Sequence, residues 1–518
     1  MQPVPREIEL KLAFDPAEAG RLKRHLGHTL TARKPKRQTL VSVYFDTPDQ
    51  TLREAGVSLR VRRVGRRLVQ TVKSGNGASA GLFDRGEWEH PVGKMQPDLD
   101  AAKDTPLAPL IDSADALRPV FESRILRTVY AFESDGSDVE VSFDQGHVDN
   151  GSSRAPVYEL ELELKRGEPA ALFRLARELS EVVRLRFAVA SKADRGYALT
   201  EDSSDRTELA ADVHLLPSMS CAAAFKVIAH GGLRQVAVNE PQVCAERPSA
   251  LHQMRIGLRR VRAAMSVFKN IVNDNERDGV RDELKWLASM LGPARDLDVF
   301  TTEVLLPLRQ DYPDDPGFAD IIADVEQRRL RAYADAVAAC RSDRYQALLL
   351  NAVAWIESGP WRIGPDALQR ARREQPIATL ATDELSRRLR AIVKKGKNLR
   401  DCGPGERHRV RICGKKLRYA AEFFADVFPG KRNARRRDAL LSGMKDLQES
   451  LGGLNDIVTR TRLASQIAKA SHAGGAPREE RAFAAGLIVG RQDGRRRRLL
   501  DAAEKAYDAI ADCKPYWN

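Results

Sequence analysis

The sequence predicts an α+β protein in which an antiparallel β region is followed by an all-α region. Two patterns carry this prediction. In the first 200 residues, apolar and polar residues alternate with period two in short stretches, which is typical of strands. From about residue 219 to about residue 511, apolar residues recur with the helical period. A chain of 518 residues that is 42% hydrophobic suggests about two to four domains with their own cores.

The net charge of +13 is concentrated in the helical region. Residues 1–200 carry 31 basic and 29 acidic side chains, a net charge of +2, so the rest of the chain carries +11. The helical region is therefore the part expected to attract polyanions. No stretch approaches the roughly 18 apolar residues of a membrane span, and the first residues lack an apolar signal core. We expect a cytoplasmic protein that has no membrane partner.

Five stretches of the N-terminal region show the strand pattern. Turn sequences such as Asp135-Gly136 separate them, and residues 15–26 and 169–183 have the helical pattern instead. We expect a mostly antiparallel β domain with a few helices over residues 1–200. The strands are predicted at 7–12, 58–62, 68–73, 139–143 and 158–165.

The helical region contains an internal repeat. The motif that starts at His252 recurs 156 residues later at His408, and a Leu-Gly motif at Leu291 recurs 160 residues later at Leu451. This nearly constant offset indicates two copies of one helical unit. A polar linker is expected at 201–217 and the helical domain at 218–511, with repeats at approximately 218–360 and 375–511.

Charged residues occupy one face of several predicted strands. Side chains two residues apart share a face, so Glu7 and Glu9 project together, as do Arg60 and Arg62 and the acids of 159–165. A single strand of this kind is usually the solvent-facing side of a half-exposed sheet. Several such strands favour a barrel with the charged face inward, where carboxylates would suit Mg²⁺ or Mn²⁺ and basic side chains would suit a phosphate chain.

The N-terminal region resembles the CYTH domain of the triphosphate tunnel metalloenzymes. The resemblance covers roughly residues 5–200 and implies an eight-stranded antiparallel tunnel that hydrolyses triphosphate compounds with a divalent metal, Mg²⁺ or Mn²⁺. It rests on motifs that occur in order: Glu7-x-Glu9-x-Lys11, Tyr44-Phe-Asp-Thr, Leu59-Arg-Val-Arg, Lys73, Arg85-x-Glu87, Arg124 and Arg127, Asp144, the row from Glu159 to Lys165, and Ser191-Lys192 before Arg195-Gly-Tyr.

The same resemblance implies roles for individual residues. The catalytic and phosphate-binding cations would be Lys11, Arg60, Arg62, Lys73, Arg85, Arg124, Arg127 and Lys192. The metal ligands would come from Glu7, Glu9, Asp144, Glu159, Glu161 and Glu163. Two choices stay open, namely Arg124 against Arg127 as the family arginine and which of the acids in 159–163 bind metal.

The expected function is metal-dependent hydrolysis of inorganic triphosphate to diphosphate and phosphate, with an appended polyphosphate-binding domain. Other activities of the same fold remain alternatives, namely adenylate cyclase and thiamine or nucleoside triphosphatase. A non-enzymatic polyphosphate-binding protein is a further alternative.

Each copy of the helical repeat carries a basic stripe. An α-helix turns about 100° per residue, so positions spaced by three and four share a face. Neither eleven-residue motif contains an acid, and like charges at this spacing destabilise a helix, so a plain solvated surface is the weaker interpretation. Neither stripe interleaves base-stacking rings, which favours inorganic polyphosphate over nucleic acid. The stripes are His252, Arg255, Arg259 and Arg262, and His408, Arg411, Lys415 and Arg418.

The duplicated motif resembles the CHAD family of helical domains over roughly residues 219–510. The resemblance implies two related helical bundles that bind inorganic polyphosphate in a central basic groove. The second copy has Lys415 and Lys416 in place of arginines and Asn455 in place of Arg295, and lysine also binds phosphate. Association with polyphosphate granules is expected to follow from this binding.

Overall fold

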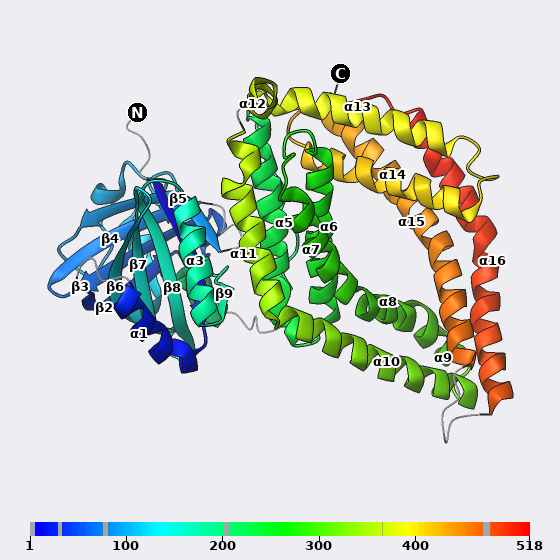
Figure 1. Cartoon of the computed structure of the whole chain (residues 1–518), viewed down its shortest axis with the longest axis horizontal. Helices are drawn as coiled ribbons and strands as arrows, with labels where there is room; N and C mark the ends of the chain where they lie inside the picture. The colour runs from blue at the N-terminus through cyan, green and yellow to red at the C-terminus, as the bar shows by residue number, and fades with distance from the viewer. Residues whose placement is uncertain are drawn as a thin grey trace. The chain divides into compact units, whose positions relative to one another are not determined.

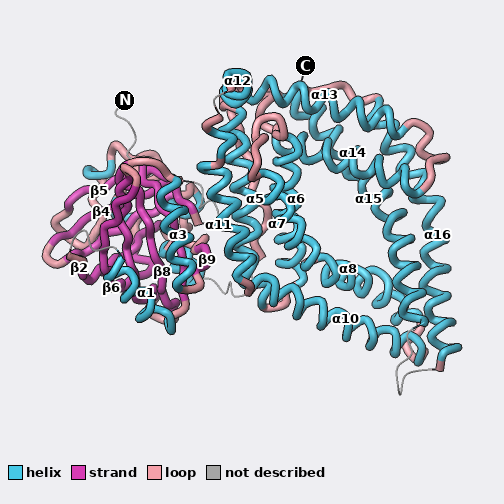
Figure 2. Tube along the Cα trace, in the orientation of Figure 1, coloured by secondary structure: helices cyan, strands magenta, loops and turns pink. Residues whose placement is uncertain are grey.

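The computed structural model describes residues 6–29, 34–75, 81–200, 207–364, 366–469 and 477–517 (Figure 1). The chain forms two compact units. The first contains the chain up to Leu209 together with Leu233–Asn239 and Ser342–Gly359, and the second contains the remainder. Strands occur in the N-terminal part and helices make up the rest, as Figure 2 shows. The predicted α+β class is confirmed.

The strands of the described residues form one antiparallel sheet that closes on itself. The hydrogen-bonding order is β5, β4, β3, β2, β6, β7, β8, β1 and β9, and β1 also pairs with β5. This last pairing closes an eight-stranded barrel, which confirms the predicted tunnel architecture. The strands are β1 (Arg6–Phe14), β2 (Lys36–Asp46), β3 (Val57–Val64), β4 (Arg67–Ser74), β5 (Leu82–Pro91), β6 (Arg118–Ser134), β7 (Ser137–Asp149), β8 (Arg154–Arg166) and β9 (Leu185–Phe187).

One edge of β1 is shared by two partners, β5 up to Leu10 and β9 from Leu12 onward. At the junction, the backbone N–H of Lys11 donates to the carbonyl of Gly81 at 2.9 Å. Gly81 has φ +86°, and a Cβ there would lie 2.4 Å from the ring of Phe187. This position therefore requires glycine, which lets β5 begin and β9 end beside the same strand.

The outer face of β2, β3 and β4 is apolar and carries a core of its own. Helix α2 (Thr51–Glu54) and the segment 92–117 cover this face, and the carboxylate of Asp46 caps α2 by accepting from the backbone N–H of Leu52 at 2.9 Å. The buried residues of this core are Phe45, Leu52, Val57, Leu59, Val61, Val72, Ala102, Leu107, Ile111 and Leu117. The remaining short helices here are η2 (Asp100–Ala102) and η3 (Ala114–Ala116).

A second apolar cluster fills one end of the barrel interior. Phe121 and Ile125 share the face of β6 that carries Arg127, and Val157 shares the face of β8 that carries Glu159, so these apolar side chains point inward. The cluster consists of Leu40, Tyr44, Phe121, Ile125, Val148, Val157 and Tyr197. We call it the apolar plug.

Helix α4 (Lys192–Thr200) belongs to this plug. A Cβ at Gly196 would lie 2.2 Å from the ring of Phe121, so glycine lets the helix lie directly on the ring. The hydroxyl of Tyr197 donates to Asp46 at 2.6 Å and fixes the helix from the other side. The unit also contains η1 (Pro16–Glu18), α1 (Ala19–Thr29) and α3 (Ala170–Val182), which confirm the two helices expected near 15–26 and 169–183.

Every described element from Cys221 onward is helical. The two repeats differ at their Leu-Gly motifs, because Pro293 starts a new helix in the first copy whereas the Gly452-Gly453 pair lies inside one 39-residue helix in the second. No helix of the described residues is long and apolar enough to span a membrane. The helices are α5 (Cys221–Cys244), α6 (Pro248–Val267), α7 (Arg277–Met290), α8 (Gly292–Phe300), the π-helical η4 (Thr301–Leu305), α9 (Leu306–Asp311), α10 (Pro316–Cys340), α11 (Asp343–Ser358), η5 (Pro360–Arg362), α12 (Ala367–Glu374), α13 (Ile377–Gly396), α14 (Pro404–Phe423), α15 (Lys431–Lys469) and α16 (Arg478–Ala511).

Residues 207–216, in the predicted linker, form neither helix nor strand. Residues 201–206 of that linker lie outside the described residues.

Candidate functional site

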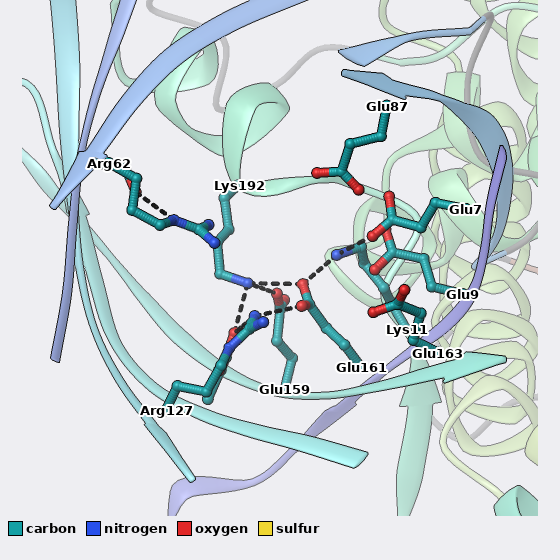
Figure 3. Close-up of polar contacts among 12 residues, drawn as sticks. Glu7, Glu9, Lys11, Arg62, Glu87, Arg127, Glu159, Glu161, Glu163 and Lys192 are labelled. Atoms are coloured by element: carbon teal, nitrogen blue, oxygen red, sulfur yellow. Dashed lines mark hydrogen bonds and ion pairs between the residues drawn. The ribbon is translucent and has the colours of Figure 1, made fainter. Parts of the chain in front are cut away.

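The strand register brings charged residues together on the inner wall of the barrel. In the ladder between β1 and β8, Lys11 lies opposite Glu161. Asp144 of β7 lies opposite Glu159 of β8, and Arg127 of β6 lies opposite Asp144. Opposite residues of a ladder project from the same face, so these five side chains converge (Figure 3).

The barrel encloses a cavity of about 1190 Å³ whose wall is rich in charge. Of the predicted metal ligands, Glu7, Glu161 and Glu163 line it, whereas Glu9, Asp144 and Glu159 lie behind the wall. The cations that line it are Lys11, Arg60, Arg62, Lys73, Arg85, Arg127, Lys165 and Lys192. Seven of the eight predicted phosphate-binding cations are therefore in one cavity.

The ammonium of Lys192 lies between three buried carboxylates. Its Nζ donates to Asp144 Oδ2 at 2.8 Å, to Glu159 Oε1 at 2.6 Å and to Glu161 Oε1 at 2.9 Å. Burial alone would lower the pKa of this lysine, but the three carboxylates raise it well above its ordinary value. Lys192 therefore stays protonated throughout the physiological range.

Glu161 accepts from three cations at once. Besides Lys192, Lys11 and Arg127 both make very short contacts with its carboxylate. Burial would raise the pKa of Glu161, yet Lys11, Lys192 and Arg127 hold it well below its usual range. Arg127 also clasps Asp144 through two hydrogen bonds of 2.7 Å, so the pKa of its guanidinium rises well above the ordinary value despite burial.

A second group of ion pairs lies between β1, β4 and β5. Lys73 contacts Glu7 at 2.6 Å and Glu87 at 2.9 Å, and Arg85 contacts Glu9 at 2.6 Å. Burial lowers the pKa of Lys73 and the neighbouring Arg85 lowers it further, although Glu9 and Glu7 oppose this shift. This group alternates acids and bases, so a metal and a polyanion could both find partners in it.

Glu163 is less well compensated than its neighbours. Its carboxylate pairs with the half-exposed Lys165, whereas burial together with the nearby Glu7 and Glu140 raises its pKa. A divalent cation placed beside Glu163 and Glu7 would remove this repulsion.

Two arginines on β3 present donors to the cavity. Arg62 donates to the hydroxyl of Ser42 at 3.1 Å and forms no ion pair with the described residues. Burial lowers the pKa of its guanidinium to about 10, and the adjacent Arg60 and Arg127 contribute to this shift. The buried Nε of Arg60 has no hydrogen-bond partner. Both features fit an anion that enters the cavity and accepts hydrogen bonds from these arginines.

The two basic stripes face each other within the second unit. Burial lowers the pKa of Lys415 on α14 to about 8, helped by Arg411 on the same helix and by Arg259 and Arg255 on α6. Burial likewise lowers the pKa of His252 to about 4, with Arg295, Arg259 and Arg255 contributing. The buried Nε atoms of Arg259 and Arg411 have no hydrogen-bond partner. Cations crowded in this way fit a polyanionic ligand.

The outer members of the stripes lie in different surroundings. Arg262 is half-buried, and Arg418 pairs with Glu422 at 2.6 Å. His408 lines a separate cavity of about 280 Å³ together with Arg407 and Arg496. The structure thus places Arg255, Arg259, Arg411 and Lys415 of the two stripes together.

Family models match both parts of the chain. The CYTH domain model matches residues 5–197, and the CHAD domain model matches residues 227–465. The chain carries a CYTH domain and a CHAD domain. These matches confirm both resemblances that the motifs indicated.

Known proteins are similar to each part of the chain and to the whole. An inorganic triphosphatase of Haemophilus influenzae is 33% identical over 196 residues, which is 38% of this chain and 55% of that protein. An uncharacterized protein of Mycobacterium tuberculosis is 27% identical and matches over 97% of both chains. The crystal structure of the CHAD domain from the plant Ricinus communis is similar with a TM-score of 0.50 and 26% identity, covering 59% of this chain and 97% of that one.

Within the CYTH domain, the structure separates the two candidate arginines. Residues three apart in a strand project from opposite faces, so Arg127 points into the cavity and Arg124 points out. The side chain of Arg124 is 60% exposed and pairs with Glu122 at 2.6 Å. The structure therefore does not bring Arg124 to the site.

Four residues of the motifs have contacts in the site that the sequence did not assign, and one of them is Lys165, which lines the cavity and pairs with Glu163. Glu87 lines the cavity and pairs with Lys73, which its position two residues after Arg85 on one strand face could have indicated. Tyr44 lines the cavity opposite Arg60, and Arg195 contacts Glu159 at 2.7 Å. A single sequence does not show these cross-strand and helix-to-strand partners.

The residues of the CYTH tunnel fit a hard divalent cation. All six predicted ligands are carboxylates, which is the donor type that Mg²⁺ and Mn²⁺ prefer. Ligand atoms of Asp144, Glu159 and Glu161 lie within 4.8 Å of one another. Lys192 already lies among these three acids, whereas the uneven charge balance at Glu163 marks a place where a cation would be stabilising.

In the CHAD domain, acids accompany the basic stripes. Asp296 of α8 and Asp456 of α15 occupy matching positions of the repeat. Burial raises the pKa of both carboxyls, and the charge of Asp456 contributes to the shift of Asp296. The sequence prediction missed them because they lie outside the eleven-residue motifs.

Proposed function

We propose that this chain is a metal-dependent triphosphatase that hydrolyses inorganic triphosphate to diphosphate and phosphate. The observation that carries the proposal is the single cavity in which seven predicted cations and three predicted metal ligands meet. The Haemophilus relative that matches the CYTH part supports the same activity. Glu7, Glu161 and Glu163 reach the cavity and would hold Mg²⁺ or Mn²⁺. The bound metal would supply Lewis-acid stabilisation of charge on the phosphoryl oxygens.

The protein side chains have separate tasks in this proposal. Arg60 and Arg62 would bind the phosphate chain, because their guanidinium groups have donors left over in the cavity. Arg127 and Lys192 are held protonated by buried carboxylates, so they keep a fixed positive charge where negative charge increases during phosphoryl transfer. Pre-positioned cations of this kind stabilise the transition state without rearrangement.

A substrate and metal panel tests the proposal. Phosphate release from inorganic triphosphate, ATP and thiamine triphosphate is measured with Mg²⁺, Mn²⁺ or no metal, and cyclic AMP formation is measured with ATP. We expect inorganic triphosphate with metal to give the highest kcat/KM. A preference for ATP or thiamine triphosphate would indicate a different activity of the tunnel. Tight binding of triphosphate without turnover under every condition would indicate a binding protein instead of an enzyme.

A matched pair of arginine variants tests whether the tunnel is the site of hydrolysis. Arg127→Met should lower kcat/KM by about 100-fold or more, the size found when one pre-positioned donor to a transition state is removed. Arg124→Met changes the same residue type on the same strand but on the outer face, so activity should stay within about twofold. Equal effects of both variants would contradict the proposal.

We further propose that the CHAD domain binds inorganic polyphosphate along the facing stripes. The crowding of Arg255, Arg259, Arg411 and Lys415 supports this, since each lowers the cost of bringing in a polyanion. Linear phosphate chains need cations and no stacking surface, which the stripes supply. Such binding would keep the CYTH domain near polyphosphate granules and raise the local concentration of substrate. We also propose that the two domains extend over 1–200 and 218–511, joined by a linker at 201–217.

Binding of polyphosphate to the double variant Arg255→Ala plus Arg411→Ala tests this second proposal. We expect at least a tenfold loss of polyphosphate affinity, because both removed charges lie at the centre of the facing stripes. A control that removes two exposed arginines elsewhere, Arg435→Ala plus Arg497→Ala, has the same net charge and should bind nearly normally. A preference for DNA over polyphosphate at equal salt would contradict the proposal.

A further inference from the structure

Three carboxylates at the back of the tunnel have the spacing of a metal site, but a lysine already lies among them. Asp144, Glu159 and Glu161 place ligand atoms within 4.8 Å of one another. The ammonium of Lys192 contacts each of the three at 2.6 to 2.9 Å, one for each of its N–H donors (Figure 3). Each of the three carboxylates therefore has one oxygen committed to Lys192.

Glu159 differs from the other two acids in the partners it serves. Asp144 is shared between Lys192 and Arg127, and Glu161 is shared among Lys192, Arg127 and Lys11. One oxygen of Glu159 accepts a hydrogen bond from Lys192 at 2.6 Å, and the other accepts one from Arg195 at 2.7 Å. Both of these donors belong to α4 and lie three residues apart, on one face of the helix.

Burial also separates Glu159 from the other acids of its strand. Its side chain is 0% exposed and does not line the cavity, whereas Glu161 and Glu163 do. A metal that bridges the wall and a phosphate chain must reach the cavity, and Glu159 offers no oxygen there. Lys192, in contrast, lines the cavity directly, at the first residue of α4.

Helix α4 is held at two further points besides its contacts with Glu159. Gly196 packs on Phe121, and Tyr197 donates to Asp46. These contacts hold the middle of the helix, and the hydrogen bonds that Arg195 and Lys192 donate to Glu159 hold its first turn. Removal of Glu159 would leave the ammonium of Lys192 to acids that also serve other cations.

We propose that Glu159 is a positioning residue that fixes Lys192 at the tunnel wall and binds no metal. The metal then falls to Glu161 and Glu163, the two acids of β8 that reach the cavity. This inference rests on the proposed function, since it supposes that the tunnel takes a metal and a triphosphate. Of the three alternating glutamates of β8, Glu159 would then position Lys192 through α4, and Glu161 and Glu163 would bind the metal.

Two matched variants test the division. Glu159→Gln and Glu163→Gln make the same chemical change on the same face of β8 in the full chain. Mn²⁺ binding is measured without triphosphate by calorimetry and by electron paramagnetic resonance, and KM and kcat for triphosphate are measured separately. Thermal unfolding of each variant shows whether the chain is folded.

We expect Glu159→Gln to bind Mn²⁺ within about twofold of the wild type but to raise KM for triphosphate by about tenfold, the lower end for loss of a supporting partner. Glu163→Gln should weaken Mn²⁺ binding by about tenfold or more. The inference is overturned when Glu159→Gln loses Mn²⁺ as strongly as Glu163→Gln does.

Double variants show whether Glu159 acts through Lys192. Lys192→Met and Lys192→Met plus Glu159→Gln should have the same KM for triphosphate, because the positioned group is already gone. Additive effects on KM would contradict a positioning role. Arg195→Met, which keeps Lys192 and Glu159, should raise KM less than Glu159→Gln and leave Mn²⁺ binding unchanged; a loss of Mn²⁺ binding there would also count against the inference.

The outcomes separate this inference from the proposed function. A wild-type chain without turnover of any triphosphate would overturn the proposed function, while the Mn²⁺ titrations of Glu159→Gln and Glu163→Gln would still decide which glutamate binds metal. Normal turnover with equal metal loss in both variants would overturn the inference alone.

Discussion

The pKa values of buried cations in this protein depend on whether their neighbours carry negative or positive charge. In the tunnel, Lys192 and Arg127 each contact more than one buried carboxylate, so their pKa values rise despite burial, whereas burial and neighbouring cations lower the pKa of Arg62. In the facing stripes of the CHAD domain, Lys415 meets arginines, so its pKa falls to about 8 after burial has already lowered it. The first arrangement makes permanent charges, and the second makes a charge that depends on the ligand.

Lys415 predicts a pH dependence of polyphosphate binding. A polyanion beside this ammonium raises its pKa, so binding takes up a proton between about pH 8, the value for the free site, and the higher pKa of the complex. In that window affinity should fall as pH rises, by at most about tenfold per unit from this group. Below about pH 8 this lysine is protonated in both states and contributes no pH dependence.

Calorimetry in two buffers of different ionisation enthalpy measures this proton uptake at pH 8.5 and at pH 7, values chosen as roughly half a unit to one unit on either side of the free-site pKa. Lys415→Arg is the control, because its guanidinium stays charged and should remove most of the uptake while binding is kept. Identical proton uptake by Lys415→Arg would show that other groups cause it.

At the scale of elements, five strands could be predicted because each alternates cleanly between a charged and an apolar face. β2 was not predicted because apolar residues pack on both of its faces. Val43 and Phe45 pack in the core on the outer face, and Leu40 and Tyr44 belong to the apolar plug. A strand that is apolar on both sides loses its period-two signal. β6 was missed for a related reason, because its inner face changes from the apolar Phe121 to the charged Arg127.

The site residues were predictable as a set but their partners were not. Motif order placed seven cations in one cavity, while the outward position of Arg124 depends on the parity of β6 and the partners of Glu159 depend on the docking of α4. Both are tertiary features, and a single sequence contains no direct signal for them.

The docking of α4 predicts a strong effect at Gly196. Gly196→Ala places a Cβ against the ring of Phe121, so the helix or the ring must move, at a cost of about 1–3 kcal/mol. Thermal unfolding should shift to lower temperature, and KM for triphosphate should rise because Lys192 moves with the helix. Gly27→Ala in α1 is the control, since its Cβ would have open space and the change should be neutral or stabilising.

At the scale of the whole molecule, two compact units carry two kinds of charge arrangement. The CYTH barrel sorts acids and bases onto one enclosed wall, so its net charge is small although its site is highly charged. The CHAD region duplicates one motif and joins the two copies at their centres. The tunnel therefore combines charges of both signs, whereas the site between the stripes is made mainly of positive charges.

Removal of divalent metal should separate the two activities. Excess EDTA is expected to abolish triphosphate hydrolysis, because the Lewis-acid stabilisation of charge on the phosphoryl oxygens would be lost. Polyphosphate binding to the stripes should remain, since it needs protein cations alone. Phosphate release and polyphosphate binding measured on the same sample check this, and loss of both together would contradict separate sites.

The apolar plug gives the barrel a direction. The buried side chains of Phe121, Ile125 and Val157 occupy one part of the interior, and the charged side chains occupy the rest. A phosphate chain in the cavity would therefore lie along the charged wall rather than against the plug.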